Sequence, residues 1–151
     1  MKVSKHILLI ILVLNGFSLA GNANAAEPEW MRIRTVLKER YIKDEFRIFY
    51  NLSGESTLTS EEADDSNTNG VPDKIENIAL QLVAARRMYV EVFKLRHPFQ
   101  SLRYAGKVKF FDVHVTTLSV NGSAGDEIVN YHRRSDPPGG YNVLSMDISK
   151  R

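Results

Sequence analysis

Apolar side chains alternate with polar ones along three segments of the chain, and this pattern predicts β-strands. The segments are residues 45–52, 107–115 and 141–148. A two-residue period places successive side chains on opposite faces of a sheet, so each strand is expected to be half-buried. Residues 126–131 predict either a fourth, short strand or a helical turn.

Two other segments have the three-to-four-residue period of amphipathic helices. They are residues 29–42 and residues 75–93, and Pro98 ends the second helix because proline cannot continue one. This long helix separates the first two strands, so it is expected to form a parallel crossover. The predicted fold class is therefore α/β (α+β): a small mixed sheet of three to four strands, one long crossover helix and an N-terminal amphipathic helix.

The first 25 residues have the three parts of a secretory signal peptide. A basic start with Lys2 and Lys5 precedes an apolar run at residues 7–14, and small residues lead to a cleavage site after Ala25. The apolar run is shorter than the roughly 20 residues that a membrane span requires. The sequence therefore predicts a secreted or periplasmic protein whose residues 26–151 form a single domain.

Removal of the signal peptide changes the charge balance. The full chain has 20 basic and 18 acidic residues, and cleavage removes two basic ones, so the mature chain has a formal net charge of zero. This balance argues against a nucleic-acid partner and against a membrane partner, and it leaves a protein or peptide partner open. The chain has no cysteine, so a secreted fold must be stabilised without disulfides, a need that a structural metal ion would suit.

Residues 65–76 follow the twelve-position pattern D-x-[DN]-x-[DN]-G-x5-E of a calcium loop. Gly70 stands where such a loop turns sharply. The predicted ligands are the side-chain oxygens of Asp65, Asn67, Asn69, Asp73 and Glu76, together with the main-chain carbonyl of Val71. The alternative is a polar, Asn-rich turn that only caps the following helix.

Ligand charge predicts how tightly this loop binds calcium. Asn67 and Asn69 occupy positions where tight sites carry aspartate, so binding is expected to be weak, with a dissociation constant of about 10⁻⁴ to 10⁻³ M. A site of that strength is still filled where calcium is millimolar, as outside a cell. The loop is present once, so the predicted role of Ca²⁺ is structural: it holds the start of the second helix.

His97, His114 and His132 raise the alternative of a zinc site, and their spacing argues against it. Catalytic zinc sites often use two ligands one helical turn apart, and the sequence contains neither H-E-x-x-H nor H-x-x-x-H. Asp112 and His114 share one face of a predicted strand, where they could form a ligand fragment or an acid–base pair. A solvated strand face is the ordinary interpretation.

A family resemblance rests on several segments in a fixed order. Residues 46–50 read FRIFY, residues 65–76 form the calcium loop, Ile78-Ala79 continue into the long helix, and residues 111–115 and 121–127 follow. This order resembles the N-terminal part of secreted bacterial zinc metallopeptidases, in which an FRIYY-like strand precedes a D-x-N-x-N-G-x-P-D-x-x-E loop and a long helix. The resemblance covers most of the mature chain.

The resemblance implies a zincin-like fold in which a later helix carries H-E-x-x-H, with two zinc-binding histidines and a general-base glutamate. No residue of this sequence matches that motif, so no catalytic residue is assigned and zinc is not supported. The chain is expected to be an incomplete domain, with truncation favoured over a short relative that keeps the scaffold. The implied function is a secreted calcium-binding domain, inactive as written; the alternative is a calcium-dependent extracellular binding or adhesion module.

Overall fold

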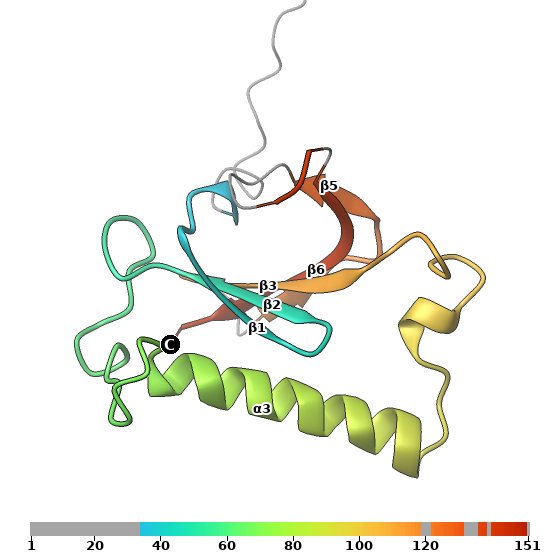
Figure 1. Ribbon diagram of the computed structural model, residues 1–151, viewed down its shortest axis with the longest axis horizontal. Coiled ribbons are helices and arrows are strands. Elements are labelled where there is room, and N and C mark those ends of the chain that lie inside the picture. Colours follow the sequence, from blue (N-terminus) through green and yellow to red (C-terminus); the bar gives the residue numbers. More distant parts are fainter. Residues whose placement is uncertain (1–33, 119–121, 132–135, 139, 151) are drawn as a thin grey trace, which may run out of the picture.

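Three parallel strands form the centre of a mixed sheet in the computed structural model, which describes residues 34–118, 122–131, 136–138 and 140–150 (Figure 1). The strands of the described residues are β1 (Glu39–Lys43), β2 (Phe46–Tyr50), β3 (Phe110–Thr116), β4 (Gly122–Ala124), β5 (Val129–Tyr131) and β6 (Tyr141–Ser149). β2 is parallel to β3, and β3 is parallel to β6. β1 pairs antiparallel with β2, while β4 and β5 pair antiparallel with β6. The sheet order is β1-β2-β3-β6-β4, with β5 also on β6.

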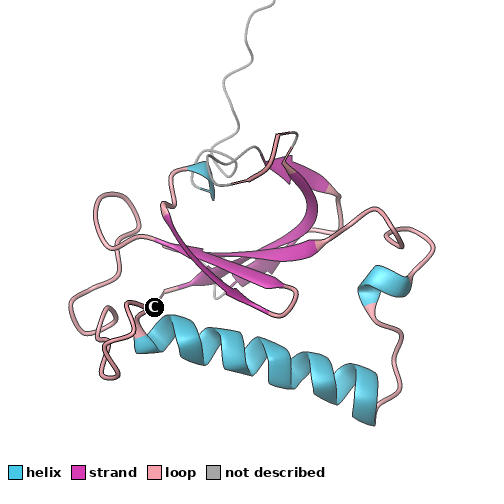
Figure 2. Ribbon diagram, viewed as in Figure 1, coloured by secondary structure: helices cyan, strands magenta, loops and turns pink. Residues whose placement is uncertain are grey.

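One long helix connects β2 to β3 and lies across one face of the sheet (Figure 2). This helix, α3 (Asp73–Arg87), continues as a π-helix, η1 (Met88–Val92), and a short 3-10 helix, η2 (Pro98–Gln100), follows. The predicted long helix and its parallel crossover are thus confirmed, as are the three main predicted strands. No helix in the described part of the chain is long and apolar enough to cross a membrane.

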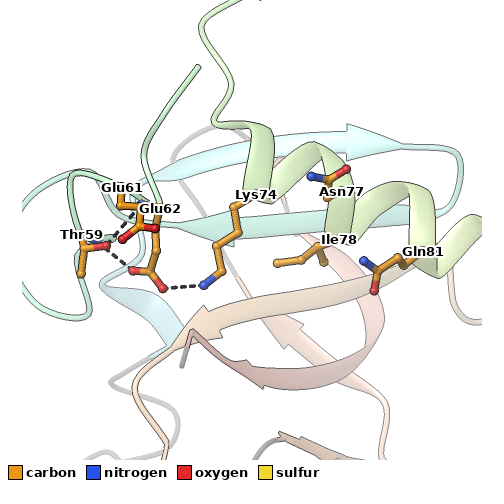
Figure 3. A pocket seen from close by; sticks show the side chains of 7 residues that line it. All are labelled: Thr59, Glu61, Glu62, Lys74, Asn77, Ile78 and Gln81. Carbon is orange, nitrogen blue, oxygen red and sulfur yellow. Dashed lines mark hydrogen bonds and ion pairs between the residues drawn. The ribbon is translucent and has the colours of Figure 1, made fainter. Parts of the chain in front are cut away.

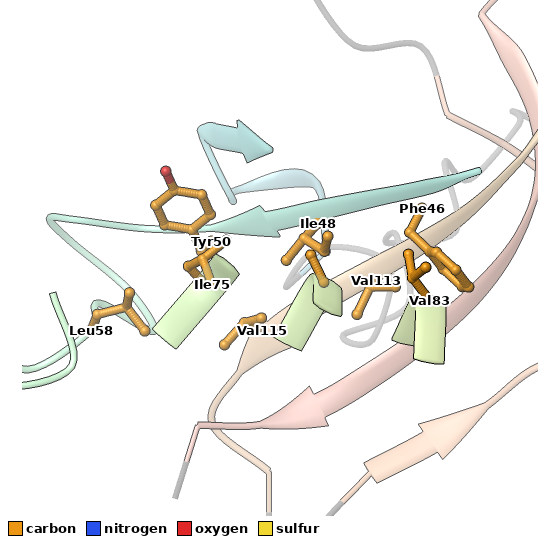
Figure 4. Packing of buried hydrophobic residues seen from close by; sticks show 9 residues of the cluster. Phe46, Ile48, Tyr50, Leu58, Ile75, Val83, Val113 and Val115 are labelled. Atoms are coloured by element: carbon orange, nitrogen blue, oxygen red, sulfur yellow. The ribbon is translucent and has the colours of Figure 1, made fainter. Parts of the chain in front are cut away.

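The main hydrophobic core fills the space between α3 and the sheet (Figure 4). The helix contributes Ile75, Ala79 and Val83, which recur every four residues and therefore lie on one face. β2 and β3 meet them with alternate side chains that share the opposing face of the sheet. The members of this cluster are Phe46, Ile48, Tyr50, Leu58, Ile75, Ala79, Val83, Val113 and Val115.

Residues 39–43 form a strand, so the predicted helix over residues 29–42 is wrong for its last part. Lys43 pairs with Phe46 across a tight turn in which Asp44 has a positive φ of 51°. Tyr41 lies against the hydrophobic core from this strand. The spacing of Leu37 and Tyr41 suited a helix equally well, and pairing with the buried strand β2 decided the conformation. Residues 34–35 are helical, and residues 29–33 lie outside the described residues, as does the predicted signal peptide.

The central strands are buried on both faces, so the prediction of half-buried strands is wrong here. All five residues of β2 are buried, including Arg47, and Asp112 and His114 on β3 are fully buried. Parallel strands at the centre of a sheet are normally covered on both sides. The face opposite α3 is therefore a second, partly polar interior.

Candidate calcium site

The predicted calcium loop connects β2 to α3 and ends in the first turn of that helix. The Asp73 amide donates to the Asp64 carbonyl at 2.8 Å, which draws the two ends of the loop together. Gly70 has a φ of +87°, a conformation that L side chains rarely adopt, so glycine is required at the turn. Backbone geometry therefore brings the start of the loop next to the helix that carries Glu76.

Asp65 organises the first half of the loop through its carboxylate. Its Oδ1 accepts a hydrogen bond from the Asn69 amide at 3.1 Å, and its Oδ2 accepts one from the Gly70 amide at 2.7 Å. Asn67 Oδ1 also accepts from the Asn69 amide, at 3.0 Å, and Asn69 Oδ1 accepts from the Val71 amide at 2.9 Å. These contacts fix the direction of three predicted ligand side chains.

Glu76, in the first turn of α3, accepts hydrogen bonds from the side chains of Asn67 and Asn69. Its Oε2 accepts a hydrogen bond from Asn67 Nδ2 at 2.9 Å, and its Oε1 accepts one from Asn69 Nδ2 at 2.8 Å. Both asparagines thus turn their amide nitrogens toward Glu76 and their oxygens toward backbone amides. A cation held jointly by Glu76 and the asparagine oxygens would require the two side-chain amides to turn over. Loop positions three, five and twelve therefore lie together, and their role as calcium ligands stays a prediction.

Two other predicted ligands, Asp73 and Val71, make different contacts. Asp73 accepts a short hydrogen bond from the Ser66 hydroxyl. The Val71 side chain packs against the hydrophobic core, which anchors the loop to the domain. Among the residues that the structure describes, no group of three or more His, Cys, Asp or Glu side chains is arranged to hold a metal ion. Calcium binding would thus depend on the asparagine oxygens as well as on carboxylates.

Tyr50 connects the loop electrostatically to the core. Burial raises the pKa of the Tyr50 phenol, and the negative charges of Glu39 and Asp65 raise the pKa further. Because Asp65 is the first predicted ligand, a cation bound in the loop would offset part of its charge. The pKa of Tyr50 is therefore expected to respond to a cation bound near Asp65.

A groove of about 620 Å³ runs beside the loop, between residues 59–62 and the first turns of α3 (Figure 3). Lys74 reaches across this groove to Glu62 Oε1 at 2.5 Å and also donates to the Lys150 carbonyl at 2.6 Å. The hydrogen bond from Lys74, aided by one from the Thr59 amide, lowers the pKa of Glu62 to about 2. Lys74, which belongs to the calcium loop, thus links this loop to the segment just after β6.

The polar face opposite α3 contains functional groups that the sequence pattern placed in solvent. Arg47 donates to Asp112 through two hydrogen bonds, Nε to Oδ1 at 2.7 Å and Nη2 to Oδ2 at 2.8 Å. Its Nη1 donates to Asp136 Oδ1 at 2.9 Å, and its guanidinium lies 4.9 Å from the centre of the Phe110 ring. Asp112 is therefore half of a buried ion pair, and the interpretation as a solvated strand face is wrong.

His114 belongs to a second buried cluster around Asp147. Its Nδ1 lies 3.3 Å from Asp147 Oδ1 and 3.2 Å from the Met146 carbonyl. Arg34 donates to both oxygens of Asp147, at 2.7 and 2.6 Å, and the Ser123 hydroxyl donates to its Oδ2 at 3.1 Å. The serine thus bonds to the aspartate and not to the histidine, so these residues lack the order of a nucleophilic triad.

His97 and His114 belong to separate clusters in the described part of the chain. His97 Nε2 lies 3.2 Å from Glu45 Oε1, beside Phe99 and Phe111, whereas His114 is in the cluster around Asp147. His132 lies outside the described residues. A signal for the buried polar face was available in the sequence: Arg47 and Asp112 occupy alternate positions of two strands predicted to be parallel, and parallel strands are usually covered on both faces.

Comparison with known proteins adds no relative to this picture. No family model, curated protein or solved structure matches the chain. The assignment of function therefore rests on the geometry of the loop and on its sequence.

The cluster around Asp147 leads to a pH-dependent prediction. Burial acts to raise the pKa of Asp147, but hydrogen bonds from His114 and Arg34 outweigh burial and hold this pKa below its usual range. A carboxylate with a lowered pKa stabilises the fold above its unfolded-state pKa of about 3.9, and this contribution is lost as the pH falls through the folded-state pKa. The free energy of unfolding should therefore fall between about pH 4 and pH 2.

Urea unfolding at a series of pH values measures this contribution. Asp147→Asn should be less stable than the parent protein at pH 7 and should lose less stability on acidification, because it cannot be protonated. Asp126→Asn, whose carboxylate is largely in solvent, should change the free energy of unfolding at pH 7 by less than about 0.5 kcal/mol. Equal acid sensitivity of Asp147→Asn and the parent would contradict the role of Asp147.

Proposed function

We propose that the chain is a secreted calcium-binding domain in which Ca²⁺ bound at residues 65–76 holds the start of α3 in place. The observation that carries this proposal is the meeting of Asn67, Asn69 and Glu76 within a loop of the calcium-binding pattern. The pattern of a signal peptide at residues 1–25 supports export. Calcium bound outside the cell would stabilise the fold, which has no disulfides because the chain contains no cysteine.

The proposed ligands are the six that the motif specifies, and the loop geometry supports four of them directly. Asp65, Asn67, Asn69 and Glu76 each have an oxygen positioned by hydrogen bonds within the loop. Asp73 would join by exchanging its bond to Ser66 for the ion. With Glu76 in the first turn of α3 and Asp65 at the entry to the loop, one ion would link the segment after β2 to the helix.

The domain further resembles the non-catalytic front half of a zinc metallopeptidase, and we propose that it is inactive as written. Support comes from the order of strand, calcium loop, long helix and parallel strand. In this proposal the calcium loop belongs to the scaffold and not to a reaction centre. Peptide hydrolysis in the presence of zinc and calcium that is abolished by His97→Ala or His114→Ala would contradict the proposal.

Isothermal titration of calcium into the mature protein tests the site. We expect binding with a dissociation constant of about 10⁻⁴ to 10⁻³ M. At calcium ten times this constant, the free energy of unfolding should rise by about 1.4 kcal/mol. Glu76→Gln should abolish both effects, because it removes the carboxylate that can bind through two oxygens.

Glu61→Gln is the matched control, since Glu61 is an exposed carboxylate outside the loop. It should bind calcium as the parent protein does. Absence of binding heat in the parent, or equal heats for the parent and Glu76→Gln, would refute the assignment of the site.

Tyr50 supplies a second, optical readout of the same event. Calcium should lower the pKa of Tyr50 toward its ordinary value, because it offsets the Asp65 charge that raises this pKa. Titration of phenolate absorbance with and without calcium measures the shift, and it should vanish in Asp65→Asn. A calcium-dependent shift that persists in Asp65→Asn would place the ion elsewhere.

A further inference from the structure

Charged residues segregate toward the two ends of α3. Residues 55–76 contain seven acidic residues and one lysine, whereas residues 86–109 contain seven basic residues, His97 and one glutamate. Figure 1 shows these segments at opposite ends of the helix, with the calcium loop at its start and the chain leading to β3 at its far end. A protein with balanced total charge therefore has a strong charge asymmetry along its length.

The basic end also exposes large apolar side chains, and we call residues 87–107 the basic-apolar tip. The exposed fraction is 69% for Val92, 56% for Phe93, 55% for Leu95 and 93% for Leu102. Four large apolar side chains are thus exposed within eleven residues, whereas single exposed apolar residues scattered over a surface are ordinary. Val92 ends η1, Phe93 and Leu95 lie between η1 and η2, and Leu102 follows η2.

Several cations of the tip are unpaired within the described residues. Arg103 contacts the acidic side chain of Asp126, and Arg86, which directly precedes the tip, contacts Asp44. Four other cations are exposed and make no ion pair with a described residue: Arg87, Lys94, Arg96 and Lys107. Their charge is therefore open to an external anionic partner.

We propose that the basic-apolar tip docks on an anionic lipid surface. Peripheral attachment to lipid needs apolar side chains that enter the acyl boundary and cations that remain at the headgroups, and the tip offers both. Aliphatic side chains such as Val92 and Leu102 add little to binding of a phosphate polymer, which favours lipid over nucleic acid. The zero net charge that argued against a membrane partner does not describe this end of the molecule.

The charge asymmetry also sets the orientation of the docked protein. With the tip on the lipid, the acidic calcium loop lies at the other end of α3 and faces away from the negative surface. Docking is therefore independent of calcium. The inference does not rest on calcium binding, and either can fail without the other.

Co-sedimentation of the mature protein with vesicles tests the docking. Vesicles of phosphatidylcholine with about 30% phosphatidylglycerol should bind the protein at about 100 mM NaCl, with chelator present, and release it at about 500 mM NaCl. Pure phosphatidylcholine should bind it at least about tenfold more weakly. Lys94→Glu with Arg96→Glu should weaken binding at least about 25-fold, at about fivefold for each lost cation.

Removal of the apolar groups provides an independent test. Phe93→Ser with Leu102→Ser should weaken vesicle binding at least about tenfold. The matched controls are Lys38→Glu and Leu52→Ser, which change an exposed cation and a half-exposed leucine away from the tip, and they should alter binding by less than about twofold. All four altered tip residues are exposed, so each variant should keep the circular dichroism spectrum of the parent.

Three outcomes would overturn the proposal. Binding only in the presence of calcium would assign the contact to the acidic loop. Binding of heparin or DNA as tight as vesicle binding, with no effect of Phe93→Ser and Leu102→Ser, would indicate a phosphate polymer. Self-association that removes the protein from vesicles and depends on the same variants would indicate a second copy of the chain.

Discussion

Arg47→Met is expected to lower the free energy of unfolding by about 3–5 kcal/mol, the usual result of removing one partner from a buried ion pair. The substitution leaves Asp112, which is fully buried, without its two hydrogen bonds from the guanidinium. It also removes the closer of the two arginines that contact Asp136. Methionine keeps most of the volume of the side chain, so the loss comes from the unpaired carboxylates and not from a cavity.

Urea unfolding of three variants tests whether the lost stability comes from the unpaired carboxylates or from a cavity. Arg47→Met with Asp112→Leu should be more stable than Arg47→Met alone, because the second change removes the buried charge that was left unpaired. Arg87→Met changes an exposed arginine at the end of α3 and should cost less than about 0.5 kcal/mol. A loss below about 1 kcal/mol in Arg47→Met would mean that the polar face is open to water.

Ile75→Ala is expected to lower the free energy of unfolding by about 2–5 kcal/mol, because it truncates a buried isoleucine in a close-packed core. Ile75 has no exposed surface and lies among Tyr50, Val115 and other members of the core between α3 and the sheet (Figure 4). It is also the eleventh residue of the calcium loop. The same residue therefore joins the loop to the core of the domain.

The measurement is urea unfolding with a calcium chelator present, so that core packing is separated from ion binding. Leu80→Ala is the matched control, because Leu80 lies on the same helix with 54% of its surface exposed. Its cost should stay below about 0.5 kcal/mol. Similar losses for both variants would show that α3 is not held to the sheet by the face that carries Ile75.

The main elements could be predicted because their signals are local. Three strands follow from a two-residue period, and α3 follows from its apolar spacing and from Pro98. The number of strands was underestimated, because β4 (Gly122–Ala124) is too short to show a period. β1 was missed because residues 39–43 become a strand only through pairing with β2, a contact that spacing does not encode.

The two candidate sites differ in the same way, because one is formed by consecutive residues and the other by residues far apart in the chain. The calcium loop is encoded by consecutive residues, so its motif could be recognised from spacing alone, and Asn67, Asn69 and Glu76 are hydrogen-bonded neighbours in the structure; their role as calcium ligands stays a prediction. The polar face depends on residues far apart in the chain, such as Arg34 and Asp147. A polar residue at every second position of a strand has the same pattern on a solvated face and on a buried one, so alternation alone does not distinguish the two, and the predicted parallel crossover was the only signal for burial.

The position of β6 has a consequence for the order in which the domain can fold. This strand pairs with β3, β4 and β5, and its own residues come last among the described strands. Loop-closure entropy must be overcome before such distant pairings become favourable, which slows folding. During folding, the local hairpin of β1 and β2 can form early, but β3 has only one of its two neighbours until β6 has paired. Acquisition of the native sheet is therefore a late, cooperative event that awaits the last strand.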